Sequence, residues 1–247
     1  YVMFELNDNL KVNYVRDIGK DKRTAIVIDN FYKNPDEVRS LALNTRSERR
    51  DDLIRGIPGE RIFIETPEVK DHLKLLFDSF CMQVGLWNKP IDPHKYEEQW
   101  DRVGFMCNIM NSKSITINPW LNLPHQDSSK ADFYAPNQFG VVVFLNTPEE
   151  CAGGTNLYSY NGMMTLPCST LNYIKKPEGF DEEVSKEDQL FPYIHDWING
   201  DREWKVEHRF NMVYNRCIVY ESDVLHSPDI DTGMFTDYNR MNQVLFM

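Results

Sequence analysis

His125 and Asp127 lie two residues apart, and both side chains can bind a metal ion. On extended backbone, residues i and i+2 point to the same face, so the imidazole and the carboxylate would aim at one point. Pro119, Trp120 and Pro124 precede the pair and would stiffen its approach. On its own, such a pair occurs by chance and is more typical of a polar loop. It predicts a metal site only if further ligands follow downstream.

His226 is the histidine best placed to complete such a site. It follows the β-rich run 218–220 and a turn at 221–223, so we expect it at the start of the next strand or in its lead-in. Two histidines and one carboxylate form the facial set that holds non-haem iron and leaves adjacent positions open. A structural zinc site would use four protein ligands, commonly with cysteine, and no cysteine lies at ligand spacing from His125. The remaining histidines are interpreted as surface or structural residues: His72, His94, His195 and His208.

Arg240 begins an apolar β run that follows His226 in the sequence. Strand alternation would place Asn242, Val244 and Phe246 on the same face as Arg240, and Met241, Gln243 and Leu245 on the other. Arg240 and Asn242 would then enter a cavity whose far end is apolar. A buried arginine requires an anion, and a carboxylate bound through two hydrogen bonds is its best match. The alternative is a surface arginine that closes a strand.

The elements that must position these residues change in character along the chain. In residues 1–99 we expect a strand at 24–28, a helix at 35–43 capped by Asn34, and a helix of about 20 residues beginning after Thr66. Residues 1–23 carry no clear element, and the charged run 46–52 with the turn 56–59 predicts an exposed loop. Short β-rich runs follow at 103–110, 115–117, 139–145, 155–160, 204–214, 217–220 and 241–246.

These patterns predict a mainly β fold with flanking helices, in one domain spanning residues 1–247. An N-terminal αβ portion, 1–99, would pack on an all-β portion, 100–247. The segment at about 175–202 is acidic and then aromatic, and it is interpreted as a helical insertion or a mobile flap that could cover substrate. A solvated helix is the competing interpretation.

Composition limits the classes of partner. The net charge of −11 argues against a nucleic-acid backbone or an anionic membrane surface as a general partner. The longest apolar run, 141–145, is far too short to span a bilayer. The first residues show no signal-peptide pattern. The five cysteines are an odd number without close pairs, so we expect reduced, mostly buried thiols and a cytoplasmic, reducing compartment.

The order His125, Asp127, His226 and Arg240 resembles the 2-oxoglutarate- and Fe(II)-dependent oxygenases, most closely their prolyl-hydroxylase-like branch. Between the pair and His226, the sequence from Val143 to Tyr158, with Leu-Asn and then Gly-Gly, is similar to two strands of that family. The segments 28–39, 120–127 and 210–215 are also similar to a group of bacterial proteins within the superfamily. The resemblance covers about residues 26–247.

The resemblance implies a double-stranded β-helix, a jelly-roll or cupin-like barrel, with the metal at one mouth. His125, Asp127 and His226 would bind Fe(II), and Arg240 would bind the distal carboxylate of 2-oxoglutarate. Asn108 would lie where the family often contacts the cosubstrate. Because halogenating relatives lack the carboxylate that Asp127 supplies, hydroxylation with O2 is favoured, with release of succinate and CO2.

The substrate, a small molecule, amino acid or peptide, and the oligomeric state are left open. Two alternatives are a non-catalytic barrel that acts as a binding module and a cupin-like or hydrolytic enzyme that uses zinc or manganese. A binding module has no need of a complete triad and Arg240, and a hydrolytic metal enzyme would not explain Arg240.

Overall fold

The computed structural model describes residues 4–45, 48–49, 60–64, 66–85, 105–110, 123–127, 139–173, 178–179, 181, 203–231 and 233–246. Within these ranges, no helix has both the length and the apolar character needed to cross a membrane. The run predicted at 115–117 and nearly all of the segment 175–202 lie outside the described residues.

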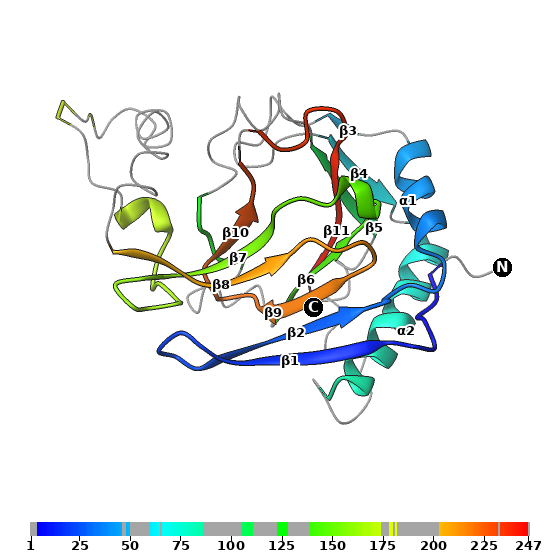
Figure 1. The fold of residues 1–247 in the computed structure, drawn as a ribbon, viewed down its shortest axis with the longest axis horizontal. Coiled ribbons are helices and arrows are strands. Elements are labelled where there is room, and N and C mark those ends of the chain that lie inside the picture. Colours follow the sequence, from blue (N-terminus) through cyan, green and yellow to red (C-terminus); the bar gives the residue numbers. More distant parts are fainter. Residues whose placement is uncertain are drawn as a thin grey trace.

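Two antiparallel sheets form the body of the molecule (Figure 1). The larger has the order β1-β2-β9-β6-β11-β5-β4-β3 and the smaller the order β10-β7-β8. The large-sheet strands are β1 (Lys11–Ile18), β2 (Arg23–Asp29), β3 (Glu48–Arg49), β4 (Glu60–Ile64), β5 (Phe105–Met110), β6 (Phe139–Phe144), β9 (Cys217–Glu221) and β11 (Arg240–Phe246). The small-sheet strands are β7 (Gly154–Tyr160), β8 (Trp204–Asn211) and β10 (His226–Asp229). The fold is therefore mainly β, with few helices.

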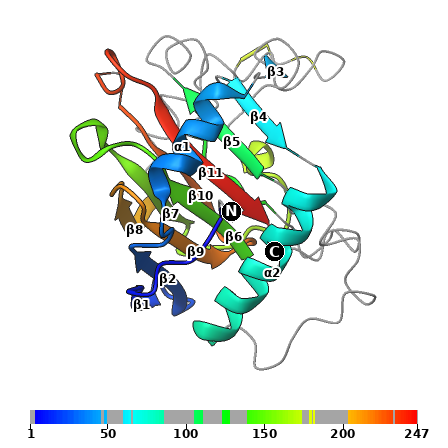
Figure 2. The same ribbon diagram turned by 90° about the vertical axis from the view of Figure 1, so that its right-hand side faces the viewer.

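Two helices cover the outer face of the large sheet (Figure 2). Helix α1 (Pro35–Asn44) and helix α2 (Pro67–Gln83) both begin with proline, whose fixed φ suits the first helical position. The hydroxyl oxygen of Thr66 accepts a hydrogen bond from the amide of Val69, as a capping residue does. Asn34 occupies the N-cap of α1 but makes no such side-chain bond. Short 3-10 turns lie at Pro148–Glu150 and Thr170–Tyr173.

The strand alternation of the large sheet separates two apolar cores. One core lies between the sheet and the helices and contains Ile26, Ile28, Phe77, Phe80, Val141, Val143, Val219, Met241 and Leu245. The other lies on the opposite face, toward the small sheet, and contains Val27, Val142, Phe144, Leu157, Phe210, Ile218 and Tyr220. Residues at alternate positions of one strand therefore face either the helices or the space between the sheets, where the candidate site lies.

In the small sheet, β7 and β8 are also joined through the carboxylate of Glu207. Its Oε1 accepts a hydrogen bond from the Ser159 hydroxyl at 2.6 Å, and its Oε2 pairs with the Lys205 ammonium at 2.7 Å. Only 7% of the Glu207 side chain is exposed. The ion pair lies within β8, and the Ser159 hydrogen bond links that strand to β7 on the side of the small sheet that is farther from β10.

Sequence patterns missed three of these strands. Residues 11–18 form β1, which lies at the edge of the large sheet and pairs only with β2, so most of its side chains are exposed and polar. Strand β3 falls within the charged run for which we predicted a loop, and β4 follows it; the two pair with each other, Glu48 opposite Arg61. Strands β1 and β3 end the described large sheet on its two sides. Edge strands tolerate charged residues because one side faces solvent, and this removes the apolar signal on which the prediction of these two strands depended.

Candidate metal centre

The segment that carries His125 and strand β10 meet at the two histidines themselves. The backbone amide of His125 donates to the carbonyl of His226, and the amide of His226 donates to the carbonyl of His125, both at 2.9 Å. This antiparallel bridge sets the ring centroids 4.5 Å apart. The segment 123–127 thus lies alongside β10, beyond the edge of the small sheet. The first residue of β10 is His226, as the sequence predicted.

Each histidine has its Nδ1 bound to a backbone carbonyl two residues earlier. Nδ1 of His125 lies 3.0 Å from the carbonyl oxygen of Leu123, and Nδ1 of His226 lies 2.9 Å from that of Val224. A carbonyl only accepts, so Nδ1 carries a proton in both rings, and in the neutral imidazole the lone pair is on Nε2. This is the tautomer that binds metals through Nε2, held by the kind of hydrogen bond that metal-binding histidines make through their other nitrogen.

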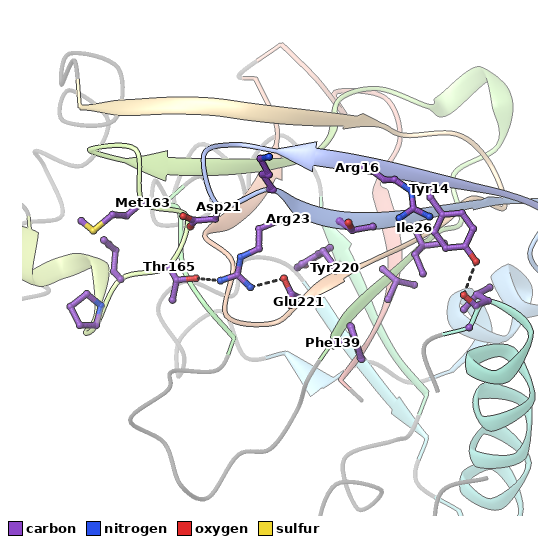
Figure 3. Close-up of a pocket in the computed structure, with 17 residues that line it drawn as sticks. Tyr14, Arg16, Asp21, Arg23, Ile26, Phe139, Met163, Thr165, Tyr220 and Glu221 are labelled. Atoms are coloured by element: carbon purple, nitrogen blue, oxygen red, sulfur yellow. Dashed lines mark hydrogen bonds and ion pairs between the residues drawn. The ribbon is translucent and has the colours of Figure 1, made fainter. Parts of the chain in front are cut away.

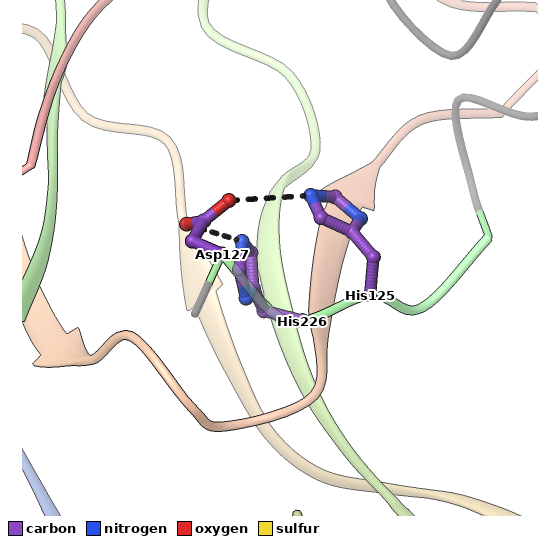
Figure 4. A group of neighbouring side chains, drawn as sticks. All are labelled: His125, Asp127 and His226. Carbon is purple, nitrogen blue, oxygen red and sulfur yellow. Dashed lines mark ion pairs between the residues drawn. The ribbon is translucent and has the colours of Figure 1, made fainter. Parts of the chain in front are cut away.

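Both Nε2 atoms point toward the carboxylate of Asp127 (Figure 4). Nε2 of His226 is 3.1 Å from Oδ2, and Nε2 of His125 is 3.8 Å from Oδ1. The amide of Asp127 donates to the carbonyl of Ser222 at 2.9 Å, which fixes the backbone below the carboxylate. The three ligand atoms lie within 4.8 Å of one another. The structure therefore brings together the three residues that were expected to form the triad.

The three groups strongly influence one another's protonation. Burial disfavours the Asp127 carboxylate, but the charge of His226, its hydrogen bond and the charge of His125 outweigh burial and lower the pKa of Asp127. Burial opposes protonation of His226, yet the Asp127 carboxylate outweighs it and raises the pKa of His226. For His125, burial and the like charge of His226 lower the pKa. The His125 side chain is 48% exposed, and the charge of the buried His226 beside it disfavours its protonation.

The donor set fits a divalent cation such as Fe(II). Two imidazole nitrogens and one carboxylate oxygen form a three-ligand site suited to non-haem iron, and carboxylate with imidazole also suits manganese or zinc. The lowered pKa of Asp127 means that its carboxylate is already ionised for such an ion. His226 and Asp127 are mostly buried, whereas His125 is open on one side. An ion at this point would be held by protein on one side and accessible from the other.

Arg240 and Asn242 lie on the face of β11 that is turned away from the helices. Their neighbours Met241 and Leu245 belong to the helix-facing core, so the predicted alternation is confirmed. Arg240 is 2% exposed. Its guanidinium donates to the side-chain oxygen of Asn242 and, at 3.2 Å, to the carbonyl of Gly154.

The carbonyl of Gly154 binds Arg240, and this position requires glycine because the backbones of β7 and β8 lie very close together here. A Cβ on Gly154 would lie 1.8 Å from the carbonyl oxygen of Phe210. The Gly-Gly pair expected from the sequence therefore permits β7 and β8 to approach at the point where Arg240 reaches across from the large sheet.

Tyr220 connects Arg240 with the triad, and it was not among the residues expected from the sequence. Its ring centroid lies 4.7 Å from that of His226. Burial raises the pKa of Tyr220, the charge of Asp127 raises it further, and the charge of Arg240 lowers it. The phenol therefore lies within electrostatic reach of both the carboxylate and the guanidinium. The sequence did carry a signal that could have identified Tyr220. It lies two residues after Ile218 on the same strand, so both side chains face the space between the sheets.

Asn146 fixes the backbone on both sides of Arg240. It is fully buried. Its side-chain amide donates to the carbonyl of Asn239 at 2.7 Å, and its side-chain oxygen accepts from the amide of Met241 at 2.7 Å. The Leu-Asn motif of the sequence includes Asn146, but the motif does not predict its hydrogen bonds to the backbone around β11.

Asn108, His72 and the cysteines were also interpreted from the sequence, and the structure describes part of each. Asn108 is the register partner of Asn242 across β5 and β11, and its side chain lies outside the described part. The carbonyl of Phe4 binds His72, which has a structural role as expected. Among the cysteines the structure describes, Cys217 is buried and Cys151 half-buried, but Cys168 is exposed, contrary to the expectation of mostly buried thiols.

Arg61 is a further cation near the triad that the sequence did not suggest. Its β4 neighbour Ile62 belongs to the helix-facing core, so Arg61 lies on the opposite face, in register with Asn108. Its charge contributes to the lowered pKa values of both His125 and Asp127. The site therefore has positive charge on both the Arg61 and the Arg240 sides.

The fold and site define a mainly β protein of two antiparallel sheets with a His-Asp-His cluster between them. The chain belongs to the family of unknown function DUF6445, which matches residues 9–241. No curated protein matches the chain. Among solved structures, it is similar to the crystal structure of EvdMO1 with a TM-score of 0.29 and 10% sequence identity, over 96% of this chain and 55% of that one. The chain thus spans about half the length of that neighbour, and a similarity of this degree carries no argument about function.

Proposed function

We propose that this protein is an Fe(II)- and 2-oxoglutarate-dependent oxygenase that hydroxylates a small molecule, amino acid or peptide. The observation that carries the proposal is the His125–Asp127–His226 cluster with both imidazoles fixed for binding through Nε2. A buried arginine on the same side of the sheet supports it further. When bound, iron and 2-oxoglutarate would supply the oxidising chemistry.

The strand order supports a double-stranded β-helix as the finer description of the fold. From β5 onward, the chain passes back and forth between the two sheets, except that β7 and β8 follow one another in the small sheet: β5, β6, β9 and β11 lie in the large sheet, and the segment 123–127, β7, β8 and β10 lie on the other side. In the large sheet, β11 therefore pairs with β5 and β6, and β9 pairs with β6, across long stretches of intervening chain. In such an arrangement, the ligands on 123–127 and β10 lie at one end of the space between the sheets.

Each residue has a distinct role in this proposal. His125, Asp127 and His226 would hold iron. Arg240, kept in place by Asn242 and the Gly154 carbonyl, would bind the distal carboxylate of 2-oxoglutarate, because a guanidinium can make two parallel hydrogen bonds to it. The phenol of Tyr220 lies within electrostatic reach of both Asp127 and Arg240 and would border the space between the metal and the arginine.

The decisive experiment is anaerobic addition of Fe(II) and then 2-oxoglutarate to the chelator-treated protein. We expect a weak visible charge-transfer band and a rise in the thermal unfolding temperature, both absent in Asp127→Ala. Arg240→Ala should weaken 2-oxoglutarate about 10- to 100-fold, the loss of one or two charged hydrogen bonds, and leave Fe(II) affinity nearly intact.

Arg209→Ala is the matched control, since Arg209 is an exposed arginine that pairs with Asp229. It should change neither affinity. If wild type shows no band and no thermal protection, the proposal is wrong. If Arg240→Ala loses Fe(II) and 2-oxoglutarate equally, the role given to Arg240 as the ligand of the 2-oxoglutarate carboxylate is wrong.

A further inference from the structure

Arg23, the first residue of β2, binds three side chains that come from two other segments. Its Nη1 donates to Glu221 at 2.5 Å and to Asp223 at 3.3 Å, and its Nη2 donates to Thr165 at 2.9 Å and to Asp223 at 3.3 Å. Thr165 in turn donates to Asp223 at 3.4 Å. We call these four residues the Arg23 cluster. Figure 3 shows the Arg23 guanidinium between Thr165 and Glu221, in the wall of a groove of about 1220 Å³ that Tyr220 also lines.

The first segment bound by Arg23 is the turn that leads from β9 to His226. Within this turn, the carbonyl of Ser222 accepts from the amide of Asp127, and the carbonyl of Val224 binds Nδ1 of His226. The turn is closed by a hydrogen bond from the amide of Val224 to the carbonyl of Glu221 at 3.1 Å. Glu221 and Asp223, which flank Ser222, are the residues that Arg23 holds. The guanidinium therefore fixes the turn that supplies one backbone acceptor to each of two ligands.

The second segment is 164–166, which also reaches the ligands. The carbonyl of Met164 accepts from the amide of Leu225, the neighbour of His226, at 2.7 Å. The amide of Leu166 donates to the side-chain oxygen of Gln126 at 2.9 Å. Gln126 lies between His125 and Asp127 in the sequence, so both strands of the site are tied to this segment. Thr165, at its centre, is the residue that binds Arg23.

A second arginine joins the same two strands at their opposite ends. Strands β2 and β9 pair with Ile26 opposite Val219, and beyond the other end of this ladder Arg216 binds Asp29 through Nε at 2.6 Å and Nη2 at 3.0 Å. The exposed fractions of the Arg216 and Arg23 side chains are 21% and 18%. The two arginines thus make ion pairs of similar burial between the same strands, but only Arg23 lies at the end where the ligands are.

We propose that Arg23 is a positioning residue of the metal centre: by holding Glu221, Asp223 and Thr165, it sets the backbone acceptors that orient His226 and Asp127. This inference rests on the proposed metal site and extends it to a residue about 100 positions before the first ligand in the sequence. Arg23 touches neither ligand itself. Its effect is transmitted through Ser222, Val224 and the 164–166 segment.

The test compares Co²⁺ binding with global stability in full-length variants. Chelator-treated wild type, Arg23→Gln and Arg216→Gln are titrated with Co²⁺ while the visible absorption is recorded, and each is melted without metal. We expect both variants to lose similar thermal stability, because each loses an ion pair between β2 and β9. Only Arg23→Gln should bind Co²⁺ on the order of 10-fold more weakly, as disturbed outer hydrogen bonds do at metal sites, with an altered absorption band.

Two further variants separate charge from geometry. Arg23→Lys keeps the charge but cannot bind three partners with one fork, so it should restore only part of the Co²⁺ affinity. Thr165→Val removes one hydrogen bond from the cluster with little change of shape, and it should weaken Co²⁺ in the same direction by a smaller factor. Thr165→Val also decides the matter if Arg23→Gln does not fold: unchanged Co²⁺ affinity in Thr165→Val would then overturn the inference.

The outcomes distinguish this inference from the proposed function. Equal Co²⁺ affinity and equal spectra in Arg23→Gln and Arg216→Gln would overturn the role of Arg23 and leave the oxygenase proposal untouched. Wild type that binds Co²⁺ but not 2-oxoglutarate would refute the oxygenase proposal. The Co²⁺ affinities of the variants would still test the role of Arg23. Wild type that binds no divalent ion would refute both.

Discussion

Replacing Asn146 by alanine tests how β11 is held at the position of Arg240. The Asn146 side chain makes two hydrogen bonds of 2.7 Å, to the Asn239 carbonyl and from the Met241 amide, in a fully buried place. Asn146→Ala leaves both backbone groups without these partners. An unsatisfied buried polar group costs about 1–3 kcal/mol, so the two together predict a loss of roughly 2–6 kcal/mol, a large part of the roughly 5–15 kcal/mol by which domains are stable.

Urea unfolding followed by tryptophan fluorescence measures this loss, and amide exchange locates it. We expect faster hydrogen exchange at the Met241 amide, and weaker 2-oxoglutarate binding because Arg240 lies between the two freed groups. Asn44→Ala is the control: Asn44 also donates to a backbone carbonyl, that of Ser40, but it is exposed, and its loss should stay within about 0.5 kcal/mol. A loss below about 1 kcal/mol in Asn146→Ala, less than one unsatisfied group, would refute the reasoning.

Three more predictions concern other parts of the molecule. In Gly140→Ala, the new Cβ would meet the Tyr220 side chain at 3.0–3.3 Å, so we expect a loss of about 1–3 kcal/mol in the free energy of unfolding measured in urea. Gly233→Ala, with open space around it, should be neutral. Burial disfavours the Glu207 carboxylate, but its hydrogen-bond donors outweigh burial and lower its pKa from 4.5. Its stabilising effect is therefore complete above pH 4.5 and lost as pH falls through the folded pKa. The stability difference between wild type and Glu207→Gln should shrink along that acid limb, and a difference independent of pH would contradict this. Chelator should lower the thermal unfolding temperature of metal-loaded wild type and leave that of Asp127→Ala unchanged; equal shifts in both would place the metal elsewhere.

The sequence predicted what depends on local periodicity. The alternation from Arg240 to Leu245 was correct because one face of β11 packs on the helices, and the start of α2 was correct because Thr66 and Pro67 mark it locally. The two histidines could be paired as candidate ligands by spacing and order alone. Their common backbone bridge could not be predicted, because it depends on the register between distant strands.

What the sequence could not give depends on partners far away in the chain. The partners of Arg23 lie 142 to 200 residues later, and Tyr220 becomes part of the site only because β9 places it beside His226. Strand β1 escaped prediction for another reason: it is an edge strand whose stability comes from pairing with β2 rather than from burying an apolar face.

The bridge between His125 and His226 has a consequence for the order in which the protein assembles. His125 and Asp127 are close together in one segment, but His226 joins them only when segments about 100 residues apart have closed a loop. An ion that binds all three residues would act as a removable cross-link across that loop, added after the slowest contacts have formed. It would therefore slow unfolding far more than it accelerates folding.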